Sequence, residues 1–228
     1  MSAVVELLAI RLTPVIELEP GAFSKQSHDM PSGSAAELPE EWDMYWRTSL
    51  LDSGISGINP IVPGSWHVPT TDMNSAHLEK VLRVIIDEWG GILSLDDSDS
   101  KPILNGGLAL SAVEQDILIE PTCCSDLGDV ANWKVAASCE KEEWEMLWIG
   151  HPFLSVRYQQ PRLILSDLHE SNDPNERWSV KPGELKKAII GAESELLKFS
   201  KRIGSILDDW GYEGPTSKVS LMLAGLES

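Results

Sequence analysis

The stretch PGELKKAIIGAESELLKFSKRIGSILDDWG, residues 182–211, decides the fold more than any other part of the sequence. Its apolar residues recur at steps of three and four, which places them on one face of an α-helix. Pro182 suits the first turn of that helix, and Gly211 suits its end. The sequence therefore predicts a long amphipathic helix over residues 183–210. Its apolar face consists of Leu185, Ile189, Ala192, Leu196, Phe199, Ile203, Leu207 and Trp210.

The apolar surface that this helix needs is expected in the preceding segment, residues 92–167. Short aliphatic runs alternate there with turn residues, a pattern typical of antiparallel strands. Asn105-Gly106-Gly107 and Gln159-Gln160-Pro161 are expected to form turns, the first because Asn and Gly tolerate positive φ. The expected strands are 92–95, 103–104, 108–110, 117–120, 146–149, 154–158 and 163–165.

A second amphipathic helix is predicted over residues 73–89, with Asp72 as its N-cap and Gly90-Gly91 at its end. A shorter helix is expected after Pro39. Residues 4–18 are predicted to form a strand that joins an edge of the sheet or pairs with a second copy of the chain, so a homodimer is one expected assembly.

These elements predict an α+β fold, in which a mainly antiparallel sheet is covered by two long amphipathic helices. The 228 residues suit a single domain, residues 1–228. Residues 20–37 and 53–71 are rich in Gly, Pro and Ser, and we expect loops or connectors there.

The chain is strongly acidic, with 36 Asp and Glu residues, 18 Lys and Arg residues and a formal net charge of −18. This charge repels phosphate backbones and anionic lipid, so we expect neither nucleic acid nor a membrane surface as a partner. Residues 1–180 hold 29 acidic and 11 basic side chains, whereas the rest of the chain is balanced. A basic protein is the partner that this distribution favours.

The sequence also predicts a cytoplasmic location. Glu6 and Arg11 interrupt the apolar N-terminal stretch before any cleavage site, so no signal peptide is expected. The longest uncharged run, residues 53–71, contains prolines and glycines that a membrane span would not carry. Three cysteines, an odd number, suit a reducing compartment.

Cys123 and Cys124 precede a helix start that a capping box at Asp126 and Asp129 predicts. A helix N-terminus lowers the pKa of a nearby thiol. Together with His151, either cysteine would therefore make a small thiol-dependent hydrolase. The competing interpretation is that both cysteines are small apolar fillers.

No metal site or cofactor is expected. The chain has no Cys-x-x-Cys pair to join Cys139 in a zinc site. The acidic turn Asp96-Asp97-Ser98-Asp99 is followed by Lys101 where a calcium loop needs a ligand. No P-loop or dinucleotide-binding fingerprint occurs in the chain.

Aromatic residues near the predicted loops are the expected contacts for a protein partner. Trp42, Tyr45, Trp46 and Trp66 lie in or beside loops, and large aromatic side chains dominate the energetics of interfaces. The aromatic segment 144–153 is expected either to pack a sheet against helices or to line a pocket. Histidines such as His28 and His67 are expected at the surface.

The segments PTCCSDLGD, LWIGHPFLSVRY and LILSDLHE, within residues 117–170, resemble uncharacterised bacterial proteins. The order of elements over residues 74–210 resembles the SUKH superfamily more remotely: a helix, an Asn-Gly-Gly turn, an Ile-Gly strand, two hairpin strands and a closing helix. That family comprises intracellular α+β immunity modules that bind polymorphic toxins and lack a general catalytic motif. The chain lacks the family's usual N-terminal helix pair with its Leu-Pro and aromatic signature, so no functional residue is transferred. We therefore expect an acidic protein-binding module, of the immunity type, that neutralises a basic toxin; the alternative is the hydrolase.

Overall fold

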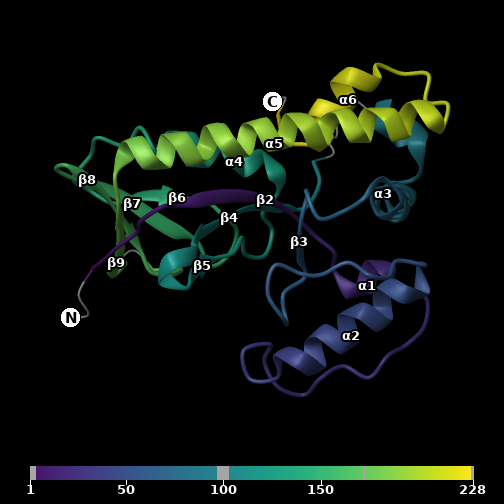
Figure 1. Cartoon of the computed structure of the whole chain (residues 1–228), viewed down its shortest axis with the longest axis horizontal. Coiled ribbons are helices and arrows are strands. Elements are labelled where there is room, and N and C mark those ends of the chain that lie inside the picture. Colours follow the sequence, from purple (N-terminus) through teal and green to yellow (C-terminus); the bar gives the residue numbers. More distant parts are fainter. Residues whose placement is uncertain (1–3, 97–102, 172, 227–228) are drawn as a thin grey trace.

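The computed structural model describes residues 4–96, 103–171 and 173–226 and contains two sheets with helices on both sides (Figure 1). The strands are β1 (Val5–Glu6), β2 (Arg11–Glu17), β3 (His67–Pro69), β4 (Gly106–Ala112), β5 (Ile117–Ile119), β6 (Glu145–Leu147), β7 (Leu154–Gln159), β8 (Arg162–Ser166) and β9 (Glu176–Val180). The α-helices are α1 (Pro20–Phe23), α2 (Pro39–Asp52), α3 (Ser75–Glu88), α4 (Val130–Ala136), α5 (Pro182–Asp209) and α6 (Thr216–Leu223), and the 3-10 helices are η1 (Ile92–Asp96), η2 (Val113–Gln115) and η3 (Leu127–Asp129).

The two sheets have the strand orders β1-β9-β8-β7-β6 and β3-β2-β4-β5. Within the described residues, β1 and β9 are parallel and every other strand pair is antiparallel. Residues 160–161 form the turn between β7 and β8, within the expected turn 159–161. The prediction of an α+β fold with mainly antiparallel strands is confirmed, but the strands of residues 92–167 are divided between two sheets rather than joined in one.

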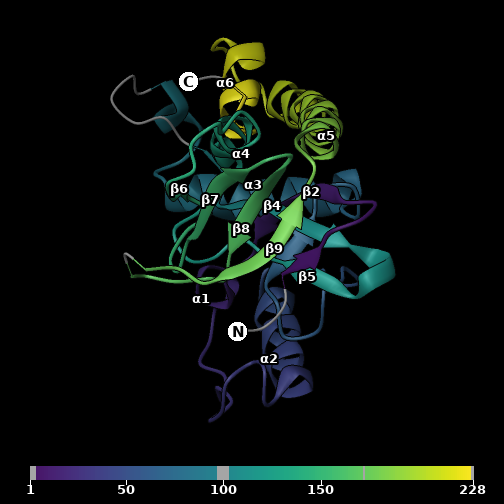
Figure 2. The same ribbon diagram turned by 90° about the vertical axis from the view of Figure 1, so that its left-hand side faces the viewer.

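Helix α5 runs along the molecule and covers one side of the sheets, together with α4 and α6 (Figures 1 and 2). Its predicted apolar face is buried from Leu185 through Phe199 to Leu207. Helices α1 and α2 lie on the opposite side of the molecule (Figure 2). Among the residues that the structure describes, no helix combines the length and apolarity needed to cross a bilayer.

The predicted strand over residues 4–18 is divided between the two sheets. Ala9, with a φ of 49°, lies between β1 and β2. β1 joins the edge of the first sheet, whereas β2 lies inside the second sheet between β3 and β4. Val15 and Ile16 on β2 are fully buried, which requires neighbours on both edges and both faces.

The prediction around Asn105 is wrong. Gly106 and Gly107 begin β4, which pairs with β2 rather than turning back onto residues 103–104. Glycine is required at position 106 because β4 and β2 approach closely there, and a Cβ would collide with Val15 O. Residues 92–95 form the 3-10 helix η1 instead of a strand.

Other local predictions differ by small shifts or omissions. Asn74, not Asp72, is the N-cap of α3, since its side chain accepts from the His77 N–H at 2.8 Å. The capping box at Asp126 and Asp129 is present before α4. The expected loops contain α1 and β3, and the sequence interpretation missed β9 and α6.

Candidate functional site

Three of the four aromatic residues expected at a partner surface lie together. The rings of Trp42 and Tyr45 are 5.7 Å apart, edge to face, and the ring of Trp66 lies 6.1 Å from that of Trp42. All three are half-buried. Their half-exposed rings therefore form one aromatic cluster, contributed by α2 and the segment before β3.

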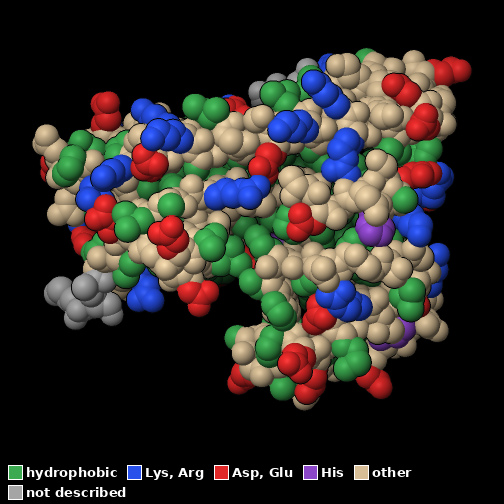
Figure 3. Space-filling view, in the orientation of Figure 1, with side chains coloured by type: hydrophobic (Ala, Val, Ile, Leu, Met, Phe, Trp, Pro, Cys, Tyr) green, Lys and Arg blue, Asp and Glu red, His purple; other side chains and the backbone are tan. Residues whose placement is uncertain are grey.

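The aromatic cluster belongs to a part of the molecule that we call the α2 lobe, residues 20–66. It includes α1, α2 and the segment leading to β3. In Figure 3 the α2 lobe is the lower part of the molecule. It protrudes from the remaining part of the protein, which we call the body, and the surface between lobe and body is hollowed. The lobe therefore presents its side chains on a protruding surface.

Trp46 does not belong to this surface. It is completely buried, and its Nε1 donates to Leu18 O at 2.9 Å. Trp46 and Leu50 form the face of α2 that packs into the core. Trp42 lies one turn earlier, where that face meets the surface, and its Nε1 donates to Gly33 O at 2.8 Å. The expectation that Trp46 contacts a partner is therefore not supported by its position.

Acidic residues surround the start of α2. Glu40 and Glu41 are exposed in its first turn, where the positive end of the helix dipole stabilises carboxylates. No salt bridge among the described residues involves either of them. Hydrogen bonds from the backbone and side chain of Ser34 lower the pKa of Glu37. Negative charge therefore lies next to the half-exposed Trp42.

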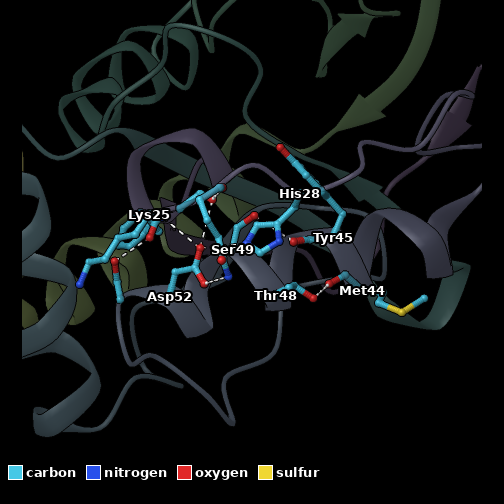
Figure 4. Close-up of polar contacts among 11 residues, drawn as sticks. Lys25, His28, Met44, Tyr45, Thr48, Ser49 and Asp52 are labelled. Atoms are coloured by element: carbon cyan, nitrogen blue, oxygen red, sulfur yellow. Dashed lines mark hydrogen bonds and ion pairs between the residues drawn. The ribbon is translucent and has the colours of Figure 1, made fainter.

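The far end of α2 is anchored by a half-buried contact between His28 and Asp52 (Figure 4). Asp52 Oδ2 lies 2.8 Å from His28 Nε2 and 3.0 Å from the Lys25 N–H, and Gln26 Nε2 donates to Oδ1 at 3.0 Å. Burial raises the pKa of Asp52, but these hydrogen bonds outweigh it and lower the pKa to about 2. His28 is 14% exposed in this pair, contrary to the expected surface position. The contacts hold residues 24–28 against α2.

Arg47 fixes the other side of the α2 lobe. Its Nε donates to Asp43 at 2.7 Å, and its terminal nitrogens donate to Ile58 O at 2.8 Å and to Asn59 Oδ1 at 3.0 Å. These bonds tie the segment after α2 back onto the helix.

A groove of about 370 Å³ lies between strands β2 to β5 and the lobe residue Ile61. Its apolar walls include Pro69, Ile117 and Leu118, and Asp116 lies at its margin. β5 is an edge strand that pairs only with β4 among the described residues. Polar and charged residues such as Arg11, Thr13 and Asp72 also line it, so the groove is of mixed polarity.

A buried polar group that the sequence interpretation missed lies on the second sheet. His67, expected at the surface, is 9% exposed, and its Nδ1 lies 3.1 Å from Glu120 Oε2. Ser65 Oγ donates to the same carboxylate oxygen. In a Ser-His-acid triad the serine and the acid contact opposite ring nitrogens, whereas both lie near Nδ1 here. The group therefore fastens Ser65 to the sheet and does not resemble a catalytic triad.

The structure brings the backbones of Cys123 and His151 together. The His151 N–H donates to Cys123 O at 2.8 Å, and both cysteines are exposed. Among the described residues, no hydrogen bond joins either sulfur to the His151 ring, which instead contacts Trp148 at 4.7 Å. The pKa of the Cys123 thiol is raised, first by the hydrogen bond and charge of the Cys124 sulfur and then by burial and the carboxylates of Glu17 and Glu19. This arrangement does not favour a thiol nucleophile activated by histidine.

The aromatic segment 144–153 is divided between the core and the surface: Leu147 and Ile149 are buried in the core, as expected, whereas its aromatic side chains are half-buried or exposed. Met146 is 61% exposed, while Trp148 and Phe153 are half-buried. Trp148, His151, Phe153 and His169 form a row of edge-to-face contacts along the surface. This row of rings lies at the surface of the protein, beside the first sheet.

No group of three or more His, Cys, Asp or Glu side chains suited to a metal ion occurs within the described ranges. Most of the acidic turn of residues 96–99 lies outside those ranges, so the structure does not describe it. Comparison of the chain with protein-family models, with curated protein sequences and with solved structures finds no match. The aromatic cluster of Trp42, Tyr45 and Trp66, with the adjacent acidic turn, is the candidate site.

Proposed function

We propose that the protein is a cytoplasmic protein-binding module that uses the α2 lobe to bind a basic protein. The observation that carries this proposal is the meeting of Trp42, Tyr45 and Trp66 as a cluster of half-buried rings at the surface of the α2 lobe. Aromatic side chains of this kind supply most of the binding energy at interfaces, because they bury a large area at small entropic cost.

The charge of the α2 lobe supports a basic partner. Residues 20–66 contain six acidic and two basic side chains. Arg47 is already held by Asp43, whereas Glu40 and Glu41 face solvent. Complementary charges at the rim of an interface speed the encounter and exclude acidic proteins.

We propose further that this partner is a toxin and that the module is of the immunity type. The remote resemblance to the SUKH superfamily and the lack of an activated nucleophile at Cys123 support this class. An immunity protein is encoded beside its toxin, so the neighbouring gene is the first candidate for the partner.

Affinity capture with the full-length tagged chain tests the proposal. The source is a lysate of cells that express the neighbouring gene, at roughly 0.1 M and then roughly 1 M salt, where the screening length falls from about 10 Å to about 3 Å. The matched variants are Trp42→Ala in the cluster and Trp144→Ala, a half-buried tryptophan of the body that contacts Arg157.

The proposal predicts that the wild type and Trp144→Ala retain one basic protein at low salt, and that Trp42→Ala loses it. High salt should reduce its recovery from the wild type and from Trp144→Ala. Capture of no basic protein, or equal capture by Trp42→Ala, would contradict the proposed site.

A further inference from the structure

Cys123 and Cys124 form a pair of exposed thiols that the binding proposal does not use. Their Sγ atoms are 3.1 Å apart, and Cys124 has a φ of 70°. Neighbouring side chains of an extended strand point to opposite faces, so this positive φ is part of what turns the two sulfurs to the same side. Both thiols are accessible to a reagent from solvent.

The backbone that carries the two thiols is firmly held. Thr122 N–H donates to Ile149 O at 2.7 Å, and Cys123 O accepts from His151 N–H at 2.8 Å. Ser125 is buried, and its Oγ donates to Thr122 O at 2.7 Å. The two sulfurs therefore face each other before any ligand arrives, so little ordering entropy is lost on binding.

The surroundings limit the ligand to one that needs two sulfur donors. No group of three metal-binding side chains occurs among the described residues, so a site for zinc would lack ligands. The carboxylates of Glu17 and Glu19 lie close enough to Cys123 to disfavour its thiolate. Anionic reagents are repelled by the same carboxylates, which favours a neutral ligand that reacts with protonated thiols.

We propose that Cys123 and Cys124 form a bidentate site for a trivalent arsenical that carries one organic substituent. Such an arsenic atom has two valences left for sulfur. An arsenoxide condenses with the two thiols, forming two As–S bonds while its oxygen leaves as water with both thiol protons. No oxidant or reductant is required, and the product at the site is neutral.

The probe for this site is phenylarsine oxide, added to the full-length chain in a phosphine reductant that contains no thiol. Native mass spectrometry should show one adduct per chain, with the mass of the reagent less one water. A dithiol should remove the adduct, whereas an equal thiol concentration of a monothiol should leave it. Peptide mapping should place the adduct on the peptide with residues 123–124.

The matched variants are Cys123→Ser, Cys124→Ser and Cys139→Ser, since Cys139 is buried and far from the pair in sequence. Loss of either paired thiol should weaken binding by about 100-fold or more, because the second As–S bond forms within the molecule. Cys139→Ser should bind like the wild type. Thermal melts of all three establish that they are folded.

The proposal is overturned if folded wild type forms no adduct, or if Cys124→Ser retains it with unchanged affinity. Removal by the monothiol as readily as by the dithiol would also overturn it, because a single As–S bond would then account for the adduct.

Discussion

Helices α5 and α2 both carry apolar residues spaced three or four positions apart, but the two helices have different surroundings. α5 buries ten of its residues against sheets and helices, whereas α2 buries only Trp46, Ser49 and Leu50. Met44 and Leu51 on α2 remain 65% and 60% exposed. Ile190 and Leu197 on α5 are also exposed, at 66% and 47%. The comparison teaches that α5 contributes more residues to the core, whereas most of α2 stays uncovered.

The largest expected effect is a difference in the free energy of unfolding between a substitution in the body and one in the α2 lobe. Phe199→Ala on α5 should lower the free energy of unfolding by about 3 to 5 kcal/mol, because Phe199 is fully buried and a cavity remains. Trp42→Ala should lower it by less, about 2 kcal/mol, since it loses the hydrogen bond to Gly33 O and two ring contacts but lies at a partly exposed position. Urea unfolding monitored by circular dichroism measures both.

A matched control for this pair is Trp46→Ala, on the same helix as Trp42 but fully buried. It should destabilise the chain by about 3 to 5 kcal/mol, like Phe199→Ala. If Trp42→Ala is as destabilising as Trp46→Ala, the ring of Trp42 belongs to the core and the division between covered and uncovered surfaces is wrong.

The second effect concerns a carboxylate buried in the body. Burial, together with the nearby Asp126 charge, raises the pKa of Asp129 to about 7. The folded state therefore holds a proton that the unfolded state releases, so stability should fall as the pH rises from about 4 to about 7. Asp129→Asn should remove this decline and stabilise the chain at pH 8 by on the order of 2 kcal/mol.

Urea unfolding of wild type and Asp129→Asn at pH 5 and pH 8 measures this effect, with the exposed Glu142→Gln as the control. An equal difference in stability between wild type and Asp129→Asn at both pH values would contradict the raised pKa.

The smallest effect concerns the α2 lobe, and its dependence on pH is opposite to that of Asp129. Because the pKa of Asp52 is lowered to about 2, its bonds to residues 24–28 should persist above about pH 4 and be lost as the pH falls through about 2. The protection factor of the Lys25 amide, which corrects for the pH dependence of the intrinsic exchange rate, should therefore fall over this range. Asp52→Asn should show fast exchange already at pH 6, and slow exchange in that variant would contradict the account.

The sequence predicted elements whose signals are local. The period of α5, the capping box at Asp126 and the turn at Gln160 depend on neighbours within a few residues, and the structure confirms each. The division into two sheets depends on pairing between distant strands. β2 pairs with residues about fifty and ninety positions away, which periodicity does not encode.

The candidate site was predicted in part for the same reason. Residue type and a position near loops predicted Trp42, Tyr45, Trp46 and Trp66 at a surface. The structure brings three of them together but buries Trp46, since the helical period does not tell how deeply each turn is covered. Gly106 was misread because positive φ serves a close backbone approach as well as a turn. No local signal distinguished the buried His67 from a surface histidine.

The most direct test of a binding surface on the α2 lobe is the association rate of the captured basic partner with two charge-reversal variants. Glu40→Lys with Glu41→Lys changes the lobe, and Glu142→Lys with Glu143→Lys changes the body by the same charge; all four side chains are exposed. At roughly 0.1 M salt, the lobe variant should associate about tenfold more slowly than wild type, and the body variant less than about threefold. Equal slowing by both variants would contradict a binding surface on the α2 lobe.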